Sequence, residues 1–443
     1  MSLLASDDSL HLQIFETLKA LFHIAISALL ISASYGAPET TINAIIAEAL
    51  SRNPELQFYV TGIAAARGER RSAGRWAYPD LSTNVGAIHY DDLNGNSLGT
   101  GPAWLVSVTQ TFEYPGRIAL RKSIADRQIA LAELGLENFR LALTNKVRFA
   151  AHRILIAQQK AEAARDVSGR LRDLLSVLEQ RPPAGVVPMI DMRIIQASTI
   201  VQERRLAEAE RDAALASYEL NQLRGADISA AFTLAKTDVD SSTWLKTSFV
   251  GIPETSVLLA WARAKNFEFR TRIVELEQQG YKVRLALNER WPSFTVGPYT
   301  RGERAIDAQL EGGVAFAVPL PFWNANRGNV DTAKAREEQA RVSLTTTWRE
   351  IERKIVAAAN AYRIQRERLQ QRQPEALRQL REAAILADEN YRASALPIAT
   401  YIELQKEYLD ATDALLSAQA DALASRDELE LLTGTRLTRA GTN

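Results

Sequence analysis

Apolar residues recur at helical spacing over most of the chain. In 117–180 and 328–392, apolar side chains follow one another at intervals of three and four residues, which predicts long helices. The first of these runs contains no proline, and at 1.5 Å per residue it would form a rod about 95 Å long. Residues 41–76 predict a shorter helix. The apolar positions follow no strict leucine heptad, so a simple two-stranded coiled coil is not expected.

Two regions alternate instead between apolar and polar positions, which predicts strands. The first is a pair at 80–92 and 103–114, separated by a cluster of turn-forming residues at 94–102. The second pair lies at 293–301 and 308–318. The strand at 103–114 would place its apolar side chains on one face and its hydroxyl side chains on the other: Trp104, Val106, Val108 and Phe112 against Ser107, Thr109 and Thr111.

The order of these elements is repeated. Residues 44–57 align with 257–270, and 186–225 align with 395–434. The identical pairs include Ala49 and Ala262, Asn53 and Asn266, Glu55 and Glu268, Pro188 and Pro397, Gln196 and Gln405, Leu223 and Leu432, and Gly225 and Gly434. This period is too long for a solenoid repeat, so the pattern indicates a duplicated half-molecule.

The repeat divides the chain into two similar halves. The first repeat spans 37–225 and would consist of a helix, the strand pair at 80–114 and a long helical hairpin at 117–224. The second repeat spans 255–434, with a helix, the strand pair at 293–318 and the hairpin at 328–433. Residues 226–254 would link the repeats, and 435–443 would form a short tail. Pro374 predicts a kink in the second hairpin.

The first residues have the order of an export signal. An apolar run at 20–33 follows Lys19 and leads into small residues up to Gly36, so residues 1–36 are expected to be a signal peptide. An ordinary amphipathic or anchoring helix is the alternative, because Asp7, Asp8 and Glu16 make the leading region acidic. No other stretch reaches about 20 apolar residues, so no helical membrane domain is expected.

Composition excludes several classes of function. The formal net charge is zero, which gives no support to nucleic-acid binding through bulk charge. The chain has no cysteine, so it has no disulfide, thiolate metal site, cysteine nucleophile or cysteine-borne lipid anchor. The histidines His11, His23, His89 and His152 do not show metal-ligand spacing, and we predict no metal site, no cofactor and no catalysis.

Strands of about ten residues have the length that crosses a bilayer as a tilted strand. Four such strands in one chain would leave open edges, which lipid does not tolerate. Two copies would give eight strands and a filled interior, whereas three copies would give twelve and an aqueous lumen. The polar positions, such as Asn84 and Thr109, suit a wet interior. The alternative is a soluble β-sandwich element bounded by helices.

Several motifs in this order resemble the TolC-like outer-membrane factors, over about 41–434. They are Asn53-Pro54-Glu55-Leu56 with its echo Asn266-Phe267-Glu268-Phe269, Tyr78-Pro79-Asp80-Leu81 with Trp291-Pro292-Ser293-Phe294, Phe112-Glu113-Tyr114-Pro115-Gly116-Arg117, Val318-Pro319-Leu320-Pro321-Phe322, Asn326-Arg327-Gly328, and Tyr391-Arg392 through Pro397 to Gln405. The chain looks most similar to the CzcC-like branch associated with heavy-metal cation efflux, in which a proline also tends to occur near Pro374.

The resemblance implies a mainly α-helical protein with a small β portion that assembles as a homotrimer. Three chains would form a 12-stranded barrel in the outer membrane of a Gram-negative bacterium and a long α-barrel across the periplasm. The tips of the helical hairpins would meet a periplasmic adaptor and, through it, an inner-membrane pump of the RND type. Many relatives carry a cysteine for lipidation, which this chain lacks.

The hairpin tips are the candidate functional residues. In the family, polar and charged side chains here constrict the closed end, and a ring of carboxylates would favour cations. The candidates for this gate are Asp191, Arg193, Tyr391, Arg392 and Glu403. The candidates for contact with the adaptor are Pro182, Pro183, Gly185, Pro188, Leu396 and Pro397. The alternative for the charged residues is a solvated helix face.

The sequence therefore predicts a passive exit duct of the outer membrane. A soluble coiled-coil scaffold with a small β cap is the alternative function.

Overall fold

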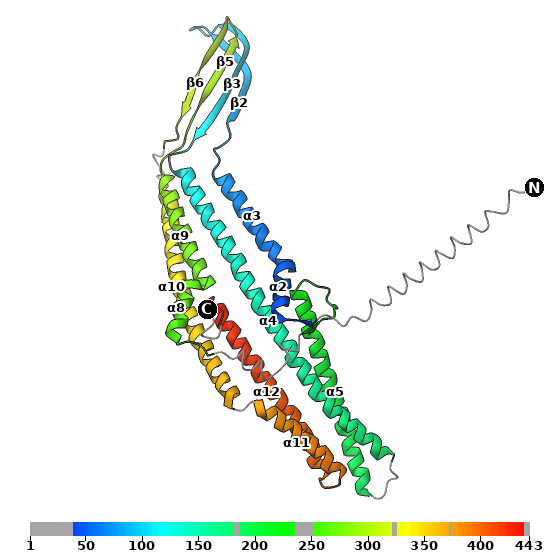
Figure 1. Ribbon diagram of the computed structural model, residues 1–443. Coiled ribbons are helices and arrows are strands. Elements are labelled where there is room, and N and C mark those ends of the chain that lie inside the picture. The colour runs from blue at the N-terminus through cyan, green and yellow to red at the C-terminus, as the bar shows by residue number, and fades with distance from the viewer. Residues whose placement is uncertain (1–38, 181–185, 235–250, 321–325, 372–373, 438–443) are drawn as a thin grey trace, which may run out of the picture.

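The structure is a computed structural model that describes residues 39–180, 186–234, 251–320, 326–371 and 374–437. A four-stranded sheet lies at one end, and the tips of two helical hairpins lie at the other (Figure 1). The predicted signal peptide at 1–36 falls outside the described residues. Among the described helices, none combines the length with the apolar composition that crossing a bilayer as a helix requires.

The first repeat contains four helices and the first strand pair. The helices are α2 (Ile42–Arg52), α3 (Glu55–Ala73), α4 (Arg117–Glu179) and α5 (Val186–Leu223), and the strands are β2 (Asp80–Asp91) and β3 (Ser97–Phe112). Short strands β1 (Glu39–Thr40) and β4 (Thr233–Leu234) pair in parallel near the middle of the molecule.

The second repeat follows the same order. Its elements are α8 (Thr255–Lys265), α9 (Phe267–Asn288), β5 (Phe294–Arg304), β6 (Ala308–Ala317), α10 (Arg327–Gln371), α11 (Pro374–Arg392) and α12 (Ile398–Thr433). Pro374 is the first residue of α11, a position where its missing N–H costs no intrahelical hydrogen bond. The predicted fold class, mainly α with four strands, is confirmed.

The first predicted helix is wrong in one respect, because 41–76 forms two helices rather than one. The break lies at Asn53, which has extended backbone angles (φ −61°, ψ 121°). The following Pro54 disfavours the helical conformation at this position. Asn266, the repeat counterpart, adopts the same conformation (φ −60°, ψ 126°) without a proline after it. The side-chain contacts of the two asparagines, described below, are therefore the cause that both breaks share.

Strand β3 is longer than the strand predicted at 103–114. It begins at Ser97, inside the region expected to be a turn, and the turn itself is confined to Asp92–Asn96. There the Asp92 carboxylate accepts the N–H groups of Asn94 and Asn96, both at 2.8 Å. Gly101 lies within β3 opposite Ile88 of β2, and the backbone at Arg304 comes very close to it. A Cβ at this residue would lie 1.6 Å from the carbonyl oxygen of Arg304.

Three apolar clusters hold the helices together. The first joins α2, α4 and α5, and the second joins α8, α10 and α12. They are built from corresponding residues of the two repeats, since Ile45, Ala49 and Leu220 in the first match Leu258, Ala262 and Leu429 in the second. The third cluster lies near the tips and combines both hairpins, with Leu171 and Ile195 packed in the same core as Tyr401.

Candidate functional site

The four-stranded sheet has the order β2-β3-β5-β6, and all neighbouring strands are antiparallel. Residues opposite each other in register lie on the same face. One face is apolar and includes Leu81, Val85, Trp104, Val106, Val108, Phe112, Val296, Leu310, Val314 and Phe316. The other face is polar and includes Asn84, Ser107, Thr109, Thr111, Tyr299, Arg301, Glu303 and Glu311. The sheet thus has the two-sided character predicted from the alternation.

The charged groups of the polar face are paired across strands. The Tyr90 hydroxyl donates to Glu303, and Arg301 forms an ion pair with the same carboxylate at 2.9 Å. The Tyr299 hydroxyl donates to Glu311 at 2.6 Å. These contacts join β2 to β5 and β5 to β6, so the polar face is a connected surface. Such a surface, on which charged and hydroxyl side chains predominate, can face water.

A buried arginine joins the sheet to the helices. Arg117, the first residue of α4, donates to the side chains of Asn288 at 3.1 Å and Ser293 at 2.8 Å. It also donates to the carbonyl oxygens of Trp291 at 2.6 Å and Asn288 at 3.3 Å. The Asn288 side chain in turn donates to the Pro115 carbonyl at 3.0 Å. Arg117 therefore connects the strand-to-helix turn of the first repeat with the helix-to-strand turn of the second.

Twin asparagines fasten the helix breaks to the ends of the hairpins. Asn53 donates to the carbonyl of Leu223 at 2.8 Å, and Asn266 donates to that of Leu432 at 2.7 Å. Each carboxamide oxygen also accepts an N–H in the first turn of the next helix, at 2.9 Å in both repeats. The identical Asn and Leu pairs of the sequence repeat are thus two copies of one contact. We call this contact the asparagine latch.

Each latch depends on the glycine that ends the hairpin. Gly225 and Gly434 have positive φ angles of 67° and 62°. A Cβ at Gly225 would lie 2.7 Å from the carbonyl oxygen of Arg52, and one at Gly434 would lie 2.5 Å from that of Lys265. Glycine is therefore required twice over, by the left-handed backbone and by the close approach of the preceding helix.

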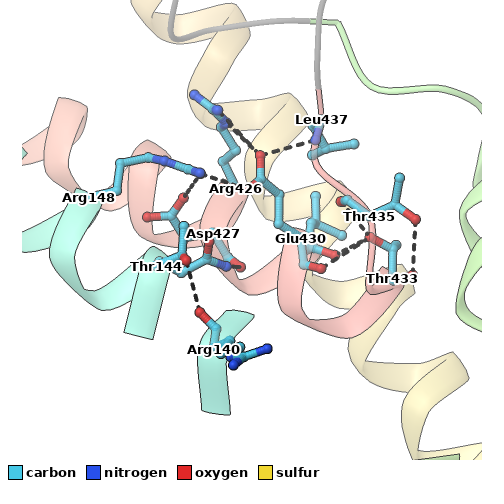
Figure 2. A network of polar contacts seen from close by, with 11 residues as sticks. Arg140, Thr144, Arg148, Arg426, Asp427, Glu430, Thr433, Thr435 and Leu437 are labelled. Atoms are coloured by element: carbon cyan, nitrogen blue, oxygen red, sulfur yellow. Dashed lines mark hydrogen bonds and ion pairs between the residues drawn. The ribbon is translucent and has the colours of Figure 1, made fainter. Parts of the chain in front are cut away.

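A buried ionic network lies where α4 of the first repeat meets α12 of the second (Figure 2). Arg148 lies 2.7 Å from the Glu430 carboxylate and 3.5 Å from that of Asp427. Arg426 approaches Glu430 at 3.3 Å, and the Leu437 N–H donates to the same carboxylate at 3.1 Å. Glu430 is fully buried. The network holds the chain after α12 against the helices.

Burial shifts the pKa values of two side chains in this region, Asp427 and His152. It raises the pKa of Asp427 to about 6, against the opposing effect of the Arg148 and Arg426 guanidinium groups. It lowers the pKa of His152 to about 3, and the same two arginines lower it further. His152 is therefore neutral at physiological pH. The described residues hold no group of three or more side chains that could ligate a metal.

At the tip of the second hairpin, the predicted gate residues Tyr391 and Arg392 lie at the end of α11. The first contacts α12, and the second contacts the preceding turn of α11. Tyr391 stacks on Tyr401, with ring centroids 5.2 Å apart, and Arg392 pairs with Asp388 at 2.8 Å. The Tyr401 hydroxyl donates to the same Asp388 carboxylate at 3.0 Å, and burial raises the pKa of Tyr401. Asp388 is thus the central acceptor of the second tip, a role that the sequence did not indicate.

The other predicted tip residues are more loosely held. Asp191 is half-buried, Arg193 is exposed and donates to Gln196 at 3.0 Å, and Glu403 is exposed with Lys406 at 3.7 Å. Leu396 packs against the apolar cluster near the tips, and Pro397 is the residue before α12. Pro182, Pro183 and Gly185 lie outside the described residues, and the side chain of Pro188 does as well. Both tips lie at the same end of the molecule (Figure 1).

With the duplicated body, the two-faced sheet and the hairpin tips established, comparison with known proteins identifies the family. Residues 45–226 match the outer membrane efflux protein family. The chain is similar to this family over these residues. The predicted resemblance is confirmed, as is the predicted location in the outer membrane. Members of the matched family are efflux proteins rather than enzymes, in agreement with the prediction for this chain.

Solved structures of similar fold cover about nine tenths of the chain. A structure of CusC has a TM-score of 0.69 at 15% identity and covers 91% of this chain and 96% of that one. The CmeC outer membrane channel of Campylobacter jejuni has a TM-score of 0.68 at 15% identity, covering 90% and 87%. The MtrE outer membrane channel of Neisseria gonorrhoeae has a TM-score of 0.67 at 16% identity, covering 91% of each. No curated protein matches the chain in sequence.

Proposed function

We propose that this protein is the passive outer-membrane exit duct of a tripartite efflux system, and that it works as a homotrimer. The observation that carries the proposal is the sheet, which has one apolar face, one polar face and two edge strands, β2 and β6. An open sheet edge presents unpaired backbone groups, and these have no water to bond with inside a bilayer. The edges therefore need strands from other copies of the chain.

The strand directions allow such a closure. In the order β2-β3-β5-β6 each strand runs antiparallel to its neighbour, so β2 and β6 run in opposite directions. The β6 strand of one copy can pair antiparallel with β2 of the next without any change of pattern. Three copies would close a barrel of 12 strands, wide enough for an aqueous lumen. The polar face, with its paired Arg301, Glu303 and Glu311, would then line the water-filled interior.

In this arrangement the helices would continue the duct into the periplasm, and the hairpin tips would form its far end. A periplasmic adaptor would contact residues 182–188 and 396–397, and an inner-membrane pump of the RND type would deliver the cargo. Asp191 and Glu403 would lie at the entrance as a carboxylate ring from three chains, which favours cations.

The carboxylate ring is tested by removing its charge in the purified duct. The variants Asp191→Asn and Glu403→Gln should lower the cation selectivity that reversal potentials measure across a planar bilayer. Asp421→Asn is the control, because Asp421 is an exposed residue of α12 far along the helix from the tip, and its replacement should leave the selectivity unchanged. Unchanged selectivity in all three variants would remove Asp191 and Glu403 from the entrance.

We propose heavy-metal cations as the cargo, on the sequence resemblance to the CzcC-like branch. A wide aqueous duct conducts ions without binding them, so the proposal requires no metal site in the wall. A strain that lacks the protein should become sensitive to metal salts and keep its tolerance of organic toxicants. Sensitivity to organic toxicants alone would assign a different cargo to the same duct.

The duct itself is tested by three measurements on purified protein. It should require detergent for solubility, have the mass of a trimer, and raise the conductance of a planar bilayer. A detergent-independent monomer without conductance would instead favour the second candidate, a soluble coiled-coil scaffold with a small β cap. The long helical hairpins are the observation that this candidate explains equally well.

A further inference from the structure

Basic side chains are concentrated where the helices α3, α4, α9 and α10 meet the sheet (Figure 1). The eleven residues nearest the sheet in these four places are 65–75, 117–127, 280–290 and 327–337. Together they include fourteen arginine and lysine residues and five aspartate and glutamate residues, although the whole chain has 53 of each sign. The rest of the chain is therefore acidic on balance, and the excess of positive charge lies beside the sheet.

Contacts between the helices show that the four segments lie at one level of the molecule. Arg70 of α3 pairs with Asp126 of α4, and Arg117 at the start of α4 donates to Asn288 at the end of α9. Helix α9 packs in turn along α10. The four segments thus form a continuous basic strip across one chain, directly beside the sheet.

Six of these cations are exposed and form no ion pair with a carboxylate of the described residues. Each lies within six residues of the sheet end of its segment, which is about 9 Å along a helix. We call this set the basic collar: Arg71, Arg75, Lys122, Arg284, Arg290 and Arg327. The exposed carboxylates without an ion pair at the same level are half as many, namely Glu69, Glu289 and Asp331. Each chain therefore presents a net positive surface at this level.

The position of the basic collar indicates which anions would balance its charge. Arg75 is followed by Trp76 and Arg290 by Trp291, and these two tryptophans are 57% and 56% exposed. Tryptophan is typical of the boundary between hydrocarbon and water, and long cationic side chains beside it extend to the polar side of that boundary. In the duct proposed above, the basic collar would lie at the level of the lipid phosphates on the helix side of the bilayer.

We propose that the basic collar binds the headgroups of anionic phospholipids in that leaflet. The proposal rests on the proposed function, because it needs the sheet to lie in a bilayer. Guanidinium groups form charge-assisted hydrogen bonds with phosphate oxygens, often at two points. Each cation near an anionic surface adds to the attraction, which falls off within a Debye length of about 10 Å at 0.1 M salt. The collar is about 9 Å deep, so all of its members would contribute.

The lipid preference of the full chain in phosphatidylcholine vesicles tests the proposal. Electron spin resonance of spin-labelled phosphatidylglycerol, and separately of spin-labelled phosphatidylcholine, measures the fraction of each lipid that the protein immobilises. We expect phosphatidylglycerol to associate several-fold more strongly than phosphatidylcholine at about 0.1 M salt. The preference should largely disappear at about 1 M salt, where the Debye length is only about 3 Å.

Removing charge from the collar should remove the preference. The triple variant Arg75→Gln, Arg290→Gln and Arg327→Gln takes one cation from each of three segments, and it should bind the two lipids almost equally. Each single substitution should give an intermediate preference, and the single variants replace the triple variant if that does not fold. The salt dependence is measured on the unaltered protein and needs no variant.

The matched control removes three exposed arginines elsewhere, by Arg140→Gln, Arg349→Gln and Arg353→Gln. These residues lie more than 20 positions further along α4 and α10 from the sheet, or about 30 Å, and the control should keep the full preference. A preference that the collar variant retains would overturn the proposal.

Two other results would also overturn it while leaving the duct in place. One is equal association of both lipids with unaltered protein that still conducts. The other is a changed reversal potential in the collar variant with no change in lipid preference, which would assign the collar to the wall of the duct. A complete lack of immobilised lipid would instead refute membrane insertion, and with it the proposed duct.

Discussion

Asp427 provides a sharp test of the buried network between α4 and α12. Its side chain is 10% exposed, and Arg148 lies nearer to Glu430 than to Asp427. Burial raises the pKa of Asp427 from 3.8 to about 6, so the carboxyl group binds a proton more tightly in the folded protein than in the unfolded chain. Replacing Asp427 with asparagine keeps the shape of the side chain and removes the titration.

The direction in which stability changes with pH follows from the linkage between proton binding and folding. Well below the ordinary pKa of 3.8 both states are protonated, and the group does not make stability depend on pH. As the pH rises toward 6, the unfolded chain loses the proton first, and the free energy of unfolding falls. A shift of about two pH units corresponds to about 3 kcal/mol in total, of which somewhat less than half is lost between pH 5 and pH 8. Asp427→Asn lacks this loss, so its stability relative to the wild type should rise by about 1 kcal/mol over that interval.

The assay is denaturant unfolding in detergent, followed by circular dichroism at several pH values from 5 to 8. Asp413→Asn is the control, because Asp413 lies on the same helix with its side chain 63% exposed. Parallel pH profiles for the wild type and Asp427→Asn would refute the reasoning. They would mean that the ion pair with Arg148 keeps Asp427 charged in the folded protein despite its burial.

Four further substitutions test the contacts between segments of the structure by the same unfolding assay. Asn53→Ala removes two hydrogen bonds of the first asparagine latch and should cost about 1–2 kcal/mol, and Asn266→Ala should cost about the same. Arg117→Met leaves the Trp291 carbonyl and the Asn288 side chain without their buried donor and should cost about 3 kcal/mol. Gly225→Ala should cost at least about 1–2 kcal/mol, because the new Cβ meets the Arg52 carbonyl in a left-handed backbone; wild-type stability would show that the chain relaxes freely there.

Sequence reasoning succeeds where the pattern is local. The absence of proline in 117–180 predicts α4 nearly to its last residue, and the alternation at 103–112 predicts both faces of β3. It fails where a contact with a distant segment decides the backbone. Residues 97–102 of β3 pair with β2, but the need for glycine at 101 comes from the approach of the Arg304 carbonyl, which lies about 200 residues away in the chain. Glycine in such a place predicts a turn, although it serves a close strand contact.

In the candidate site too, local features were predictable from the sequence and contacts between distant segments were not. The tip residues are recognisable by their place in the repeat, but Asp388, which binds both Arg392 and Tyr401, is not. Arg117 belongs to a recognisable motif but has no evident role in it, because its partners Asn288 and Ser293 belong to the other repeat. No spacing within one segment could indicate these pairings, since they arise from the packing of one repeat against the other.

The repeat also shows where the two halves have diverged. Leu223 and Leu432 receive the same asparagine latch, yet two residues before each leucine the halves differ, with Asn221 in the first and Glu430 in the second. Asn221 donates to the carbonyl of Ile228 at 2.8 Å, whereas Glu430 accepts the N–H of Leu437 at the corresponding position of the chain. The Glu430 carboxylate pairs with Arg148 and Arg426, so the second repeat has an ionic network where Asn221 makes amide hydrogen bonds in the first. A buried ionic network adds little stability over an apolar one but tolerates few alternative arrangements. Its place at α4 and α12 therefore suits a joint that must hold two similar hairpins in distinct positions.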